Sequence, residues 1–189
     1  ELIHAPEIIE NDDAPVMAVR KKKNSSMMTA IQMVKDRHVD VMASAGNTGA
    51  LMAGSLLITG RLAGVERPAL TVVAPTFAGG NVVLLDVGAN MDARAEHLLQ
   101  YGIMGKIYAR EVLDKPLPRI GLLNVGSEEI KGNERVKKAY GLLKDKVPGF
   151  VGNVEARDIL NGAADVIVCD GFVGNIVLKT VEGITEGLF

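Results

Sequence analysis

The chain has 189 residues, 48% of them apolar, so one domain with a proper hydrophobic core is feasible. Charged residues make up 23% of the chain and its net charge is −2, which argues against nucleic-acid binding through clustered Lys and Arg. The single cysteine excludes an intrachain disulfide framework and favours a reducing cytosol over secretion. No stretch approaches the roughly 20 apolar residues that cross a bilayer.

Both ends of the chain are abrupt. Glu1 opens without Met in what reads as the tail of a strand, and residues 180–189 stop inside a predicted helix. We therefore expect sequence to be missing on both sides of a single α/β catalytic domain that spans residues 1–189.

The first third of the chain predicts three helices and one strand. Residues 14–23 form a short helix with Pro15 near its first turn, where the missing N–H costs nothing. Ser25 is the predicted N-cap of a second helix, which carries an apolar stripe to about Arg37. Residues 39–44, short and apolar, are predicted as a buried strand, and a long apolar helix runs from Ala50 to about Leu62.

The remainder alternates strands with helices. Strands are predicted at 69–74, 82–86, 119–123 and 165–169, and helices at 93–113, 133–146 and after residue 170. Residues 150–151 lead into a turn at Gly152 and Asn153 and a short helix to Leu160. Continuous apolar strands that alternate with helices predict an α/β fold of three αβα layers, with a mostly parallel sheet covered on both faces.

Glycine and asparagine or aspartate gather where the predicted strands end, in turns at 46–49, 86–90, 124–126, 152–153 and 170–175. Ligands of open α/β sheets bind beyond the carboxyl ends of the strands. Glycine permits close backbone approach, a following helix N-terminus attracts anions, and an Asn amide donates without adding charge. Any one turn is equally well explained as a cap. Five such turns at one sheet edge predict a site for a phosphate-type anion.

Several other kinds of site are disfavoured. The chain contains no P-loop, no dinucleotide fingerprint and no nucleophile elbow. The three histidines, His4, His38 and His97, lack metal-ligand spacing, so neither a metal nor a cofactor is expected. Cys169 ends a predicted buried strand and is interpreted as an inert core thiol. The candidate cations are Lys131 and Lys179, although either is equally well explained as a solvated helix residue.

The turns also carry motifs in the order of a known family. Residues 44–50 (SAGNTGA), 85–90 (LDVGAN), 121–126 (GLLNVG), 131–134 (KGNE), 152–158 (GNVEARD) and 170–175 (DGFVGN) resemble the phosphate acyltransferase family of bacterial phospholipid synthesis. The resemblance runs from about Val19 to Gly183. It implies a fold similar to phosphotransacetylases and the isocitrate/isopropylmalate dehydrogenase group. It also implies an acyltransferase that makes acyl phosphate from long-chain acyl-acyl carrier protein and inorganic phosphate.

The family further implies a homodimer that needs no metal and works in the bacterial cytoplasm. Contact with the membrane surface is expected only through segments that this chain lacks. By this resemblance, the expected catalytic residues are Asn47, Asn124, Asp170 and Lys179. The expected substrate-binding residues are Gly46, Thr48, Gly49, Asn90, Gly126, Lys131, Asn153, Glu155, Gly171 and Asn175.

Individual roles are hypotheses. Asn47 and Thr48 bind phosphate oxygens, with Lys179 or Lys131 balancing the charge, and the other Asn amides hold the carbonyl or further oxygens. Asp170 or Glu155 takes a phosphate proton or orients a lysine. Two alternatives stay open. One is a short-chain phosphotransacetylase that acts on acyl-CoA, and the other is a non-catalytic module that senses phosphate or acyl phosphate.

Overall fold

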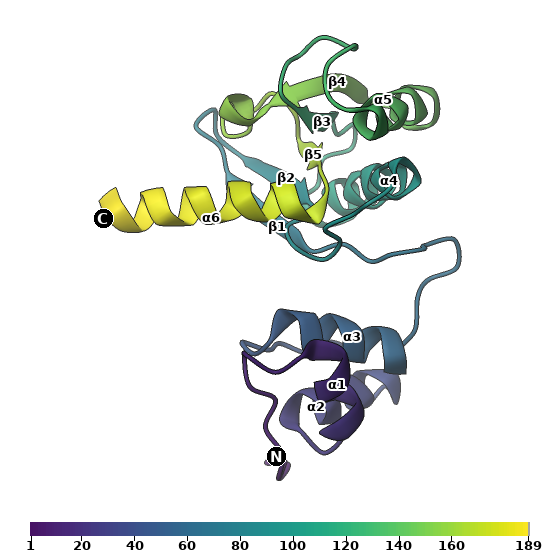
Figure 1. Ribbon diagram of the computed structural model, residues 1–189, viewed down its shortest axis with the longest axis vertical. Coiled ribbons are helices and arrows are strands. Elements are labelled where there is room, and N and C mark those ends of the chain that lie inside the picture. The colour runs from purple at the N-terminus through teal and green to yellow at the C-terminus, as the bar shows by residue number, and fades with distance from the viewer. Residues whose placement is uncertain (189) are drawn as a thin grey trace. The chain divides into compact units, whose positions relative to one another are not determined.

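The computed structural model describes residues 1–188 (Figure 1). The chain divides into two compact units, Glu1–Val65 and Glu66–Phe189, and each is described by itself. The single catalytic domain expected over residues 1–189 stays a prediction.

The first unit is built from three helices, α1 (Pro15–Lys21), α2 (Ser26–Lys35) and α3 (Thr48–Ile58). Pro15 occupies the first turn of α1, and the Ser25 side chain accepts a hydrogen bond from the Met28 N–H, so the predicted N-cap is confirmed. The helices pack around a small core of Val19, Met27, Met28, Ile31 and Ala50.

Residues 39–44 do not form the predicted strand. They are irregular backbone, and Val41 is 80% exposed. An apolar run becomes a strand only when another strand pairs with its backbone groups. Among the described residues of this unit, the only β-type pairing is the isolated bridge between Glu7 and Ser25, so this segment has no strand to join.

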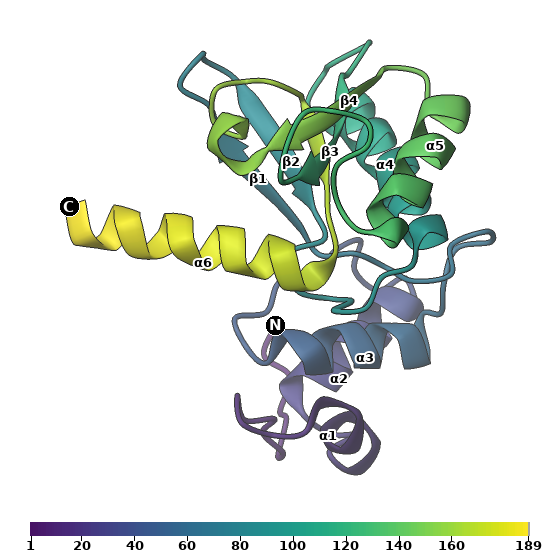
Figure 2. The same ribbon diagram turned by 45° about the horizontal axis from the view of Figure 1, so that its top comes forward.

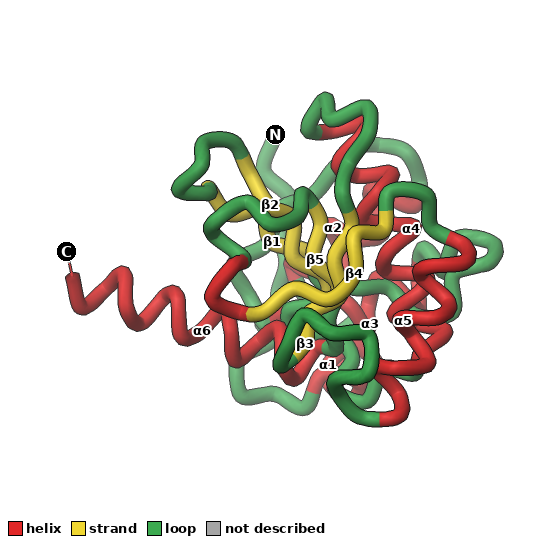
Figure 3. The backbone as a smooth tube through the Cα atoms, turned by 90° about the horizontal axis from the view of Figure 1, so that it is seen from above, coloured by secondary structure: helices red, strands yellow, loops and turns green. Residues whose placement is uncertain are grey.

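The second unit contains a five-stranded sheet with the order β1-β2-β5-β3-β4 (Figure 3). Its strands are β1 (Thr71–Pro75), β2 (Asn81–Leu85), β3 (Ile120–Asn124), β4 (Phe150–Glu155) and β5 (Val166–Val168). The edge strand β1 pairs with β2 antiparallel, whereas β2–β5, β5–β3 and β3–β4 are parallel. The predicted mostly parallel sheet is thereby confirmed.

Helices cover both faces of this sheet (Figure 2). On one face, α4 (Ala95–Val112) packs on β2 and β5, and α5 (Glu134–Lys146) packs on β4 and against α4. On the other, α6 (Gly171–Leu188) packs on β2 and contributes Val177 and Leu178 to the core around Val82 and Leu84. The 3-10 turn η1 (Ala156–Asp158) follows β4. Because side chains alternate between the faces of a strand, continuous apolar strands serve both layers and produce the predicted three-layer arrangement.

The predicted turn at Gly152 and Asn153 is wrong, because both residues lie inside β4. The pairing of β3 with β4 shifts register here, and Gly152 adopts a φ of +102°. The pairing skips Val151, and Gly152 beside it takes a positive φ that favours glycine. The sequence alone cannot distinguish this bulge from a turn. The short helix predicted to reach Leu160 is a single 3-10 turn.

In the part of the chain that the structure describes, no helix is both long enough and apolar enough to cross a membrane.

Candidate functional site

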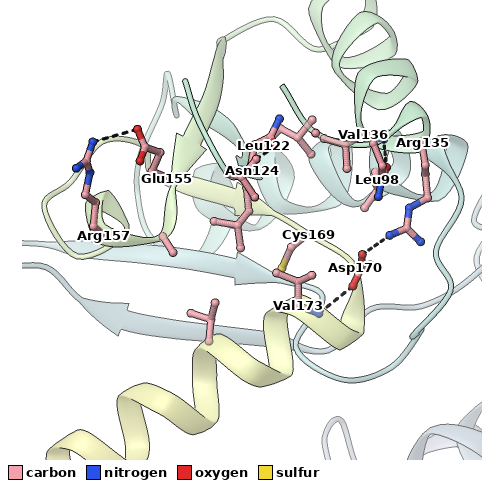
Figure 4. A pocket seen from close by; sticks show the side chains of 16 residues that line it. Leu98, Leu122, Asn124, Arg135, Val136, Glu155, Arg157, Cys169, Asp170 and Val173 are labelled. Carbon is pink, nitrogen blue, oxygen red and sulfur yellow. Dashed lines mark hydrogen bonds and ion pairs between the residues drawn. The ribbon is translucent and has the colours of Figure 1, made fainter. Parts of the chain in front are cut away.

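A cavity of about 540 Å³ lies beyond the carboxyl ends of β3, β4 and β5 in the second unit (Figure 4). Its walls come from these strand ends, from α4 and α5 on one face, and from α6 on the other. The volume is in the range of small-molecule sites, and the position is where open α/β sheets bind their ligands. Of the fourteen expected site residues, three line this cavity: Asn124, Glu155 and Asp170.

Asp170 follows β5 and is only 6% exposed. One carboxylate oxygen accepts a hydrogen bond from the Val173 N–H at 2.9 Å, which satisfies a donor in the first turn of α6. The other oxygen lies 2.5 Å from Nη2 of Arg135. The carboxylate is therefore fixed by a helix N-terminus and a guanidinium group together.

Arg135 is a site residue that sequence reasoning missed. It stands in the first turn of α5, which is capped by the Asn133 side chain accepting from the Val136 N–H at 3.0 Å. Its Nε is buried, and among the described residues it has no hydrogen-bond partner. An unsatisfied guanidinium N–H at a cavity wall is costly unless a ligand meets it. The available signal was its position directly after the motif at 131–134, two residues beyond the N-cap Asn133.

A second arginine, Arg157, also lines the cavity and was not predicted. Its Nη2 lies 3.1 Å from the Glu155 carboxylate, and its side chain is 76% exposed. An exposed pair of this kind contributes little to stability. Arg157 is therefore available to an anion that enters the cavity from solvent.

The rest of the cavity wall is largely apolar, with Cys169 among its residues. Burial, together with the charges of Asp170 and Asp86, raises the pKa of the Cys169 thiol far above its usual range. The thiol donates to the Asp86 carbonyl at 3.3 Å. A thiol held neutral in this way is no nucleophile, as the sequence indicated.

Two expected Asn side chains hold the loop between β3 and α5. Nδ2 of Asn124 donates to the Lys131 carbonyl at 3.1 Å, and Nδ2 of Asn153 donates to the Glu128 carbonyl at 2.8 Å. Gly126 is buried within this loop, and Lys131 pairs loosely with Glu128 at 3.8 Å. By bonding to these two carbonyls, the amides hold the backbone of the loop at the rim of the cavity.

Asn90 belongs to a network around Asp86. The Asp86 carboxylate accepts backbone N–H groups at 2.8–3.2 Å from Leu70, Gly88, Ala89 and Asn90. Nδ2 of Asn90 donates to Asp86 at 2.9 Å and to the Pro68 carbonyl at 2.7 Å. The network fixes the turn after β2, and Asn90 does not line the cavity.

Three expected residues on α6 also lie outside the cavity wall. A Cβ on Gly171 would meet the Asn90 backbone at 2.8 Å, so this glycine permits close packing of the helix start. Asn175 lies beside Gly88. Lys179 is 66% exposed and pairs with Glu182 at 2.6 Å, and that hydrogen bond raises the pKa of Lys179. Their parts in binding or catalysis stay predictions.

The turn at 46–49 belongs to the first unit. Asn47 caps α3 by accepting from the Ala50 N–H at 2.9 Å, and its Nδ2 donates to the carbonyls of Glu10, Asn11 and Asp13. Thr48 opens α3, while Gly46 and Gly49 lie close to Met27 and Pro15. A site that Asn47 shares with Asn124, Asn153 and Asn175 stays a prediction.

Among residues 1–188, no group of three or more His, Cys, Asp or Glu side chains is placed to hold a metal ion.

The fold is similar to that of a phosphotransacetylase from Streptococcus pyogenes, with a TM-score of 0.62 at 18% identity. That likeness covers 93% of this chain and 63% of the other. It places the chain among three-layer α/β proteins with the phosphotransacetylase fold.

Sequence comparison then gives the family. A family described as "Fatty acid synthesis protein" matches residues 1–189, and the chain belongs to it. The chain is 57% identical over 188 residues to a phosphate acyltransferase of Geobacillus thermodenitrificans, and 54% identical over 189 residues to one of Brevibacillus brevis. All of the chain is covered in both cases, but it spans only 57% and 56% of those relatives.

Proposed function

We propose that the chain forms the acceptor site of a phosphate acyltransferase, in which inorganic phosphate attacks the thioester of a long-chain acyl-acyl carrier protein. The products are acyl phosphate, used for phospholipid synthesis, and the free carrier thiol. The observation that carries this proposal is Arg135, whose buried Nε has no hydrogen-bond partner among the described residues of an otherwise largely apolar cavity. The names of the relatives support the same chemistry.

Phosphate binds at Arg135 in this scheme. A guanidinium offers a planar fork of donors that matches phosphate oxygens. Arg157 adds a second positive charge at the rim, where it exchanges its contact with Glu155 for the anion. Both cations reduce the cost of bringing a dianion beside apolar side chains.

The reaction needs no acyl-enzyme. A phosphate oxygen forms a bond to the thioester carbon, the carbon–sulfur bond breaks, and the proton that phosphate loses reaches the leaving thiolate. Asp170 touches Arg135 and can relay this proton. Orientation of the two substrates supplies about 7–11 kcal/mol in favourable cases. Amides such as that of Asn124 stabilise the oxyanion.

The acyl donor, the oligomeric state and the location belong to the same proposal. The donor is the acyl thioester of acyl carrier protein, the protein acts as a homodimer, and both substrates are cytoplasmic. A membrane contact belongs to segments beyond this chain. These points follow from the family resemblance rather than from the cavity.

The test is phosphate-dependent release of thiol from hexadecanoyl-acyl carrier protein. Arg135→Lys keeps the charge beside Asp170 but removes the fork, and we expect the KM for phosphate to rise at least about tenfold. Arg110→Lys on α4, whose side chain is exposed and pairs with its neighbour Glu111, is the matched control and leaves the KM unchanged. Thiol release without phosphate, or a preference for acetyl-CoA over the long-chain donor, contradicts the proposal.

A further inference from the structure

The charged side chains that line the cavity balance one another. The cations are Arg135 and Arg157. The carboxylates are Glu155 and Asp170, and each of them contacts one of the arginines (Figure 4). A dianion that enters the cavity therefore meets as much negative as positive charge. Attraction to a cation is not enough for binding here, because a carboxylate repels any ligand oxygen that has only lone pairs to present.

The two carboxylates differ in how firmly they are held. The Glu155 side chain is 28% exposed, and its partner Arg157 is largely exposed, so solvent screens this pair and both side chains can turn away from an incoming anion. Asp170 is buried and is fixed by the Val173 N–H and by Nη2 of Arg135. Asp170 is therefore the carboxylate that every ligand of this cavity must accommodate.

The Asp170 carboxylate has acceptor capacity that the protein does not use. Each of its oxygens has two lone pairs, and among the described residues each accepts one hydrogen bond, from Arg135 or from the Val173 N–H. Its burial leaves little access for water to fill the remaining positions. A buried acceptor of this kind at a cavity wall favours a ligand that brings a hydrogen-bond donor.

Arg135 brings the ligand next to this acceptor. Nε and Nη2 of a guanidinium group are neighbours on one edge of its planar fork. Nη2 already lies 2.5 Å from Asp170, and Nε has no hydrogen-bond partner among the described residues. An anion that accepts from Nε thus lies close to the Asp170 carboxylate. Two oxyanions that share one guanidinium group repel each other unless a proton lies between them.

We propose that Asp170 makes the site selective for a tetrahedral oxyanion that carries a proton, as hydrogen phosphate does, and that it excludes sulfate. This inference rests on the proposed function and names the residue that discriminates between acceptors. Near neutral pH phosphate retains a hydroxyl group that donates to Asp170, whereas sulfate has none. A site built to pair with a ligand hydroxyl rejects the analogue that lacks it, because the buried acceptor then stays unpaired beside a like charge.

The test measures binding of phosphate, arsenate and sulfate to the chain by calorimetry at neutral pH. Arsenate is the matched ligand, because it has the shape and charge of phosphate and also retains a hydroxyl group. We expect similar affinities for phosphate and arsenate. The dissociation constant of sulfate should be at least about tenfold higher, the difference expected when one charge-assisted hydrogen bond is lost.

A pair of variants assigns the selectivity to Asp170. Asp170→Asn removes the charge, keeps an oxygen that accepts from the Val173 N–H, and offers an amide donor to the ligand. It should weaken phosphate and strengthen sulfate, so that the preference for phosphate falls at least about tenfold. Asp92→Asn is the matched control and leaves the preference unchanged. It also removes the carboxylate of an Asp–Arg pair, but Asp92 is exposed, pairs with Arg67 and does not line the cavity.

Sulfate that binds the parent as tightly as phosphate overturns the proposal, and this result does not depend on the folding of any variant. So does an Asp170→Asn chain in which both anions weaken alike, because Asp170 then only supports the structure of the site. Failure here is distinguishable from failure of the proposed function. If the anions bind alike, phosphate-dependent thiol release that still responds to Arg135→Lys leaves the function standing, whereas a parent that binds no phosphate removes both.

Discussion

Gly174 allows α6 to start directly against the turn after β2, and Gly174→Ala tests this packing. The added methyl would lie 2.9 Å from the Asp86 carbonyl carbon and 2.8 Å from Cys169 Sγ, and would overlap the Asp86 carbonyl oxygen. Unstrained carbon–carbon contacts are about 3.5–4.0 Å, so the helix start must move by roughly half an ångström or more. Neither backbone can rotate out of the way. We expect the free energy of unfolding to fall by about 3 kcal/mol, at the upper end for overpacking.

Gly183→Ala is the matched control, because it makes the same change in the same helix where a Cβ meets nothing within 4 Å. It gains roughly 0.5–1 kcal/mol from helix propensity. Urea unfolding followed by circular dichroism measures both variants. A Gly174→Ala chain within about 0.5 kcal/mol of the parent would refute the close packing of α6 that fixes Asp170.

Three further predictions concern stability and reactivity. Partial burial would raise the pKa of Asp165, but hydrogen bonds and charges from Lys115 and Arg119 outweigh it and lower the pKa to about 2. The ionised Asp165 therefore stabilises the fold at pH values above the pKa that it has in the unfolded chain. This stabilisation is lost as the pH falls toward 2. Asp165→Asn should cost about 1–2 kcal/mol at pH 7, with the gap to the parent closing between about pH 4 and 2 in pH-dependent urea unfolding. Asn47→Ala should lower the free energy of unfolding by about 2 kcal/mol, because it removes the N-cap of α3 and three hydrogen bonds to backbone carbonyls. An unchanged midpoint of thermal unfolding contradicts this prediction. Cys169 should resist a disulfide exchange reagent in the native chain and react fully in urea; rapid native labelling at pH 8 is the contrary result.

Much of the second unit could be predicted from the sequence, because its strands are continuous apolar runs ended by polar turns. The predicted strands at 82–86 and 165–169 correspond, within one residue at each end, to the inner strands β2 and β5, which carry side chains into both layers. Residues 39–44 show the limit of this pattern. Whether an apolar run forms a strand depends on a partner elsewhere in the chain, and periodicity contains no information about that partner.

The sequence predicted where the candidate site lies better than it predicted which residues line it. Asn124 at the end of β3 and Asp170 just after β5 lie at the cavity, where the fold class binds its ligands. Arg135 was missed because an arginine in a charged helix reads as a solvated residue. Only the packing of α5 against the sheet brings its guanidinium to Asp170.

The central claim is that Arg135 binds inorganic phosphate. Calorimetric titration of the chain with phosphate tests this claim most directly. We predict saturable binding that weakens at least about tenfold in Arg135→Lys, the effect of losing one charge-assisted hydrogen bond of the guanidinium fork, and stays unchanged in Arg110→Lys. Equal phosphate affinity in the parent and Arg135→Lys would contradict the account.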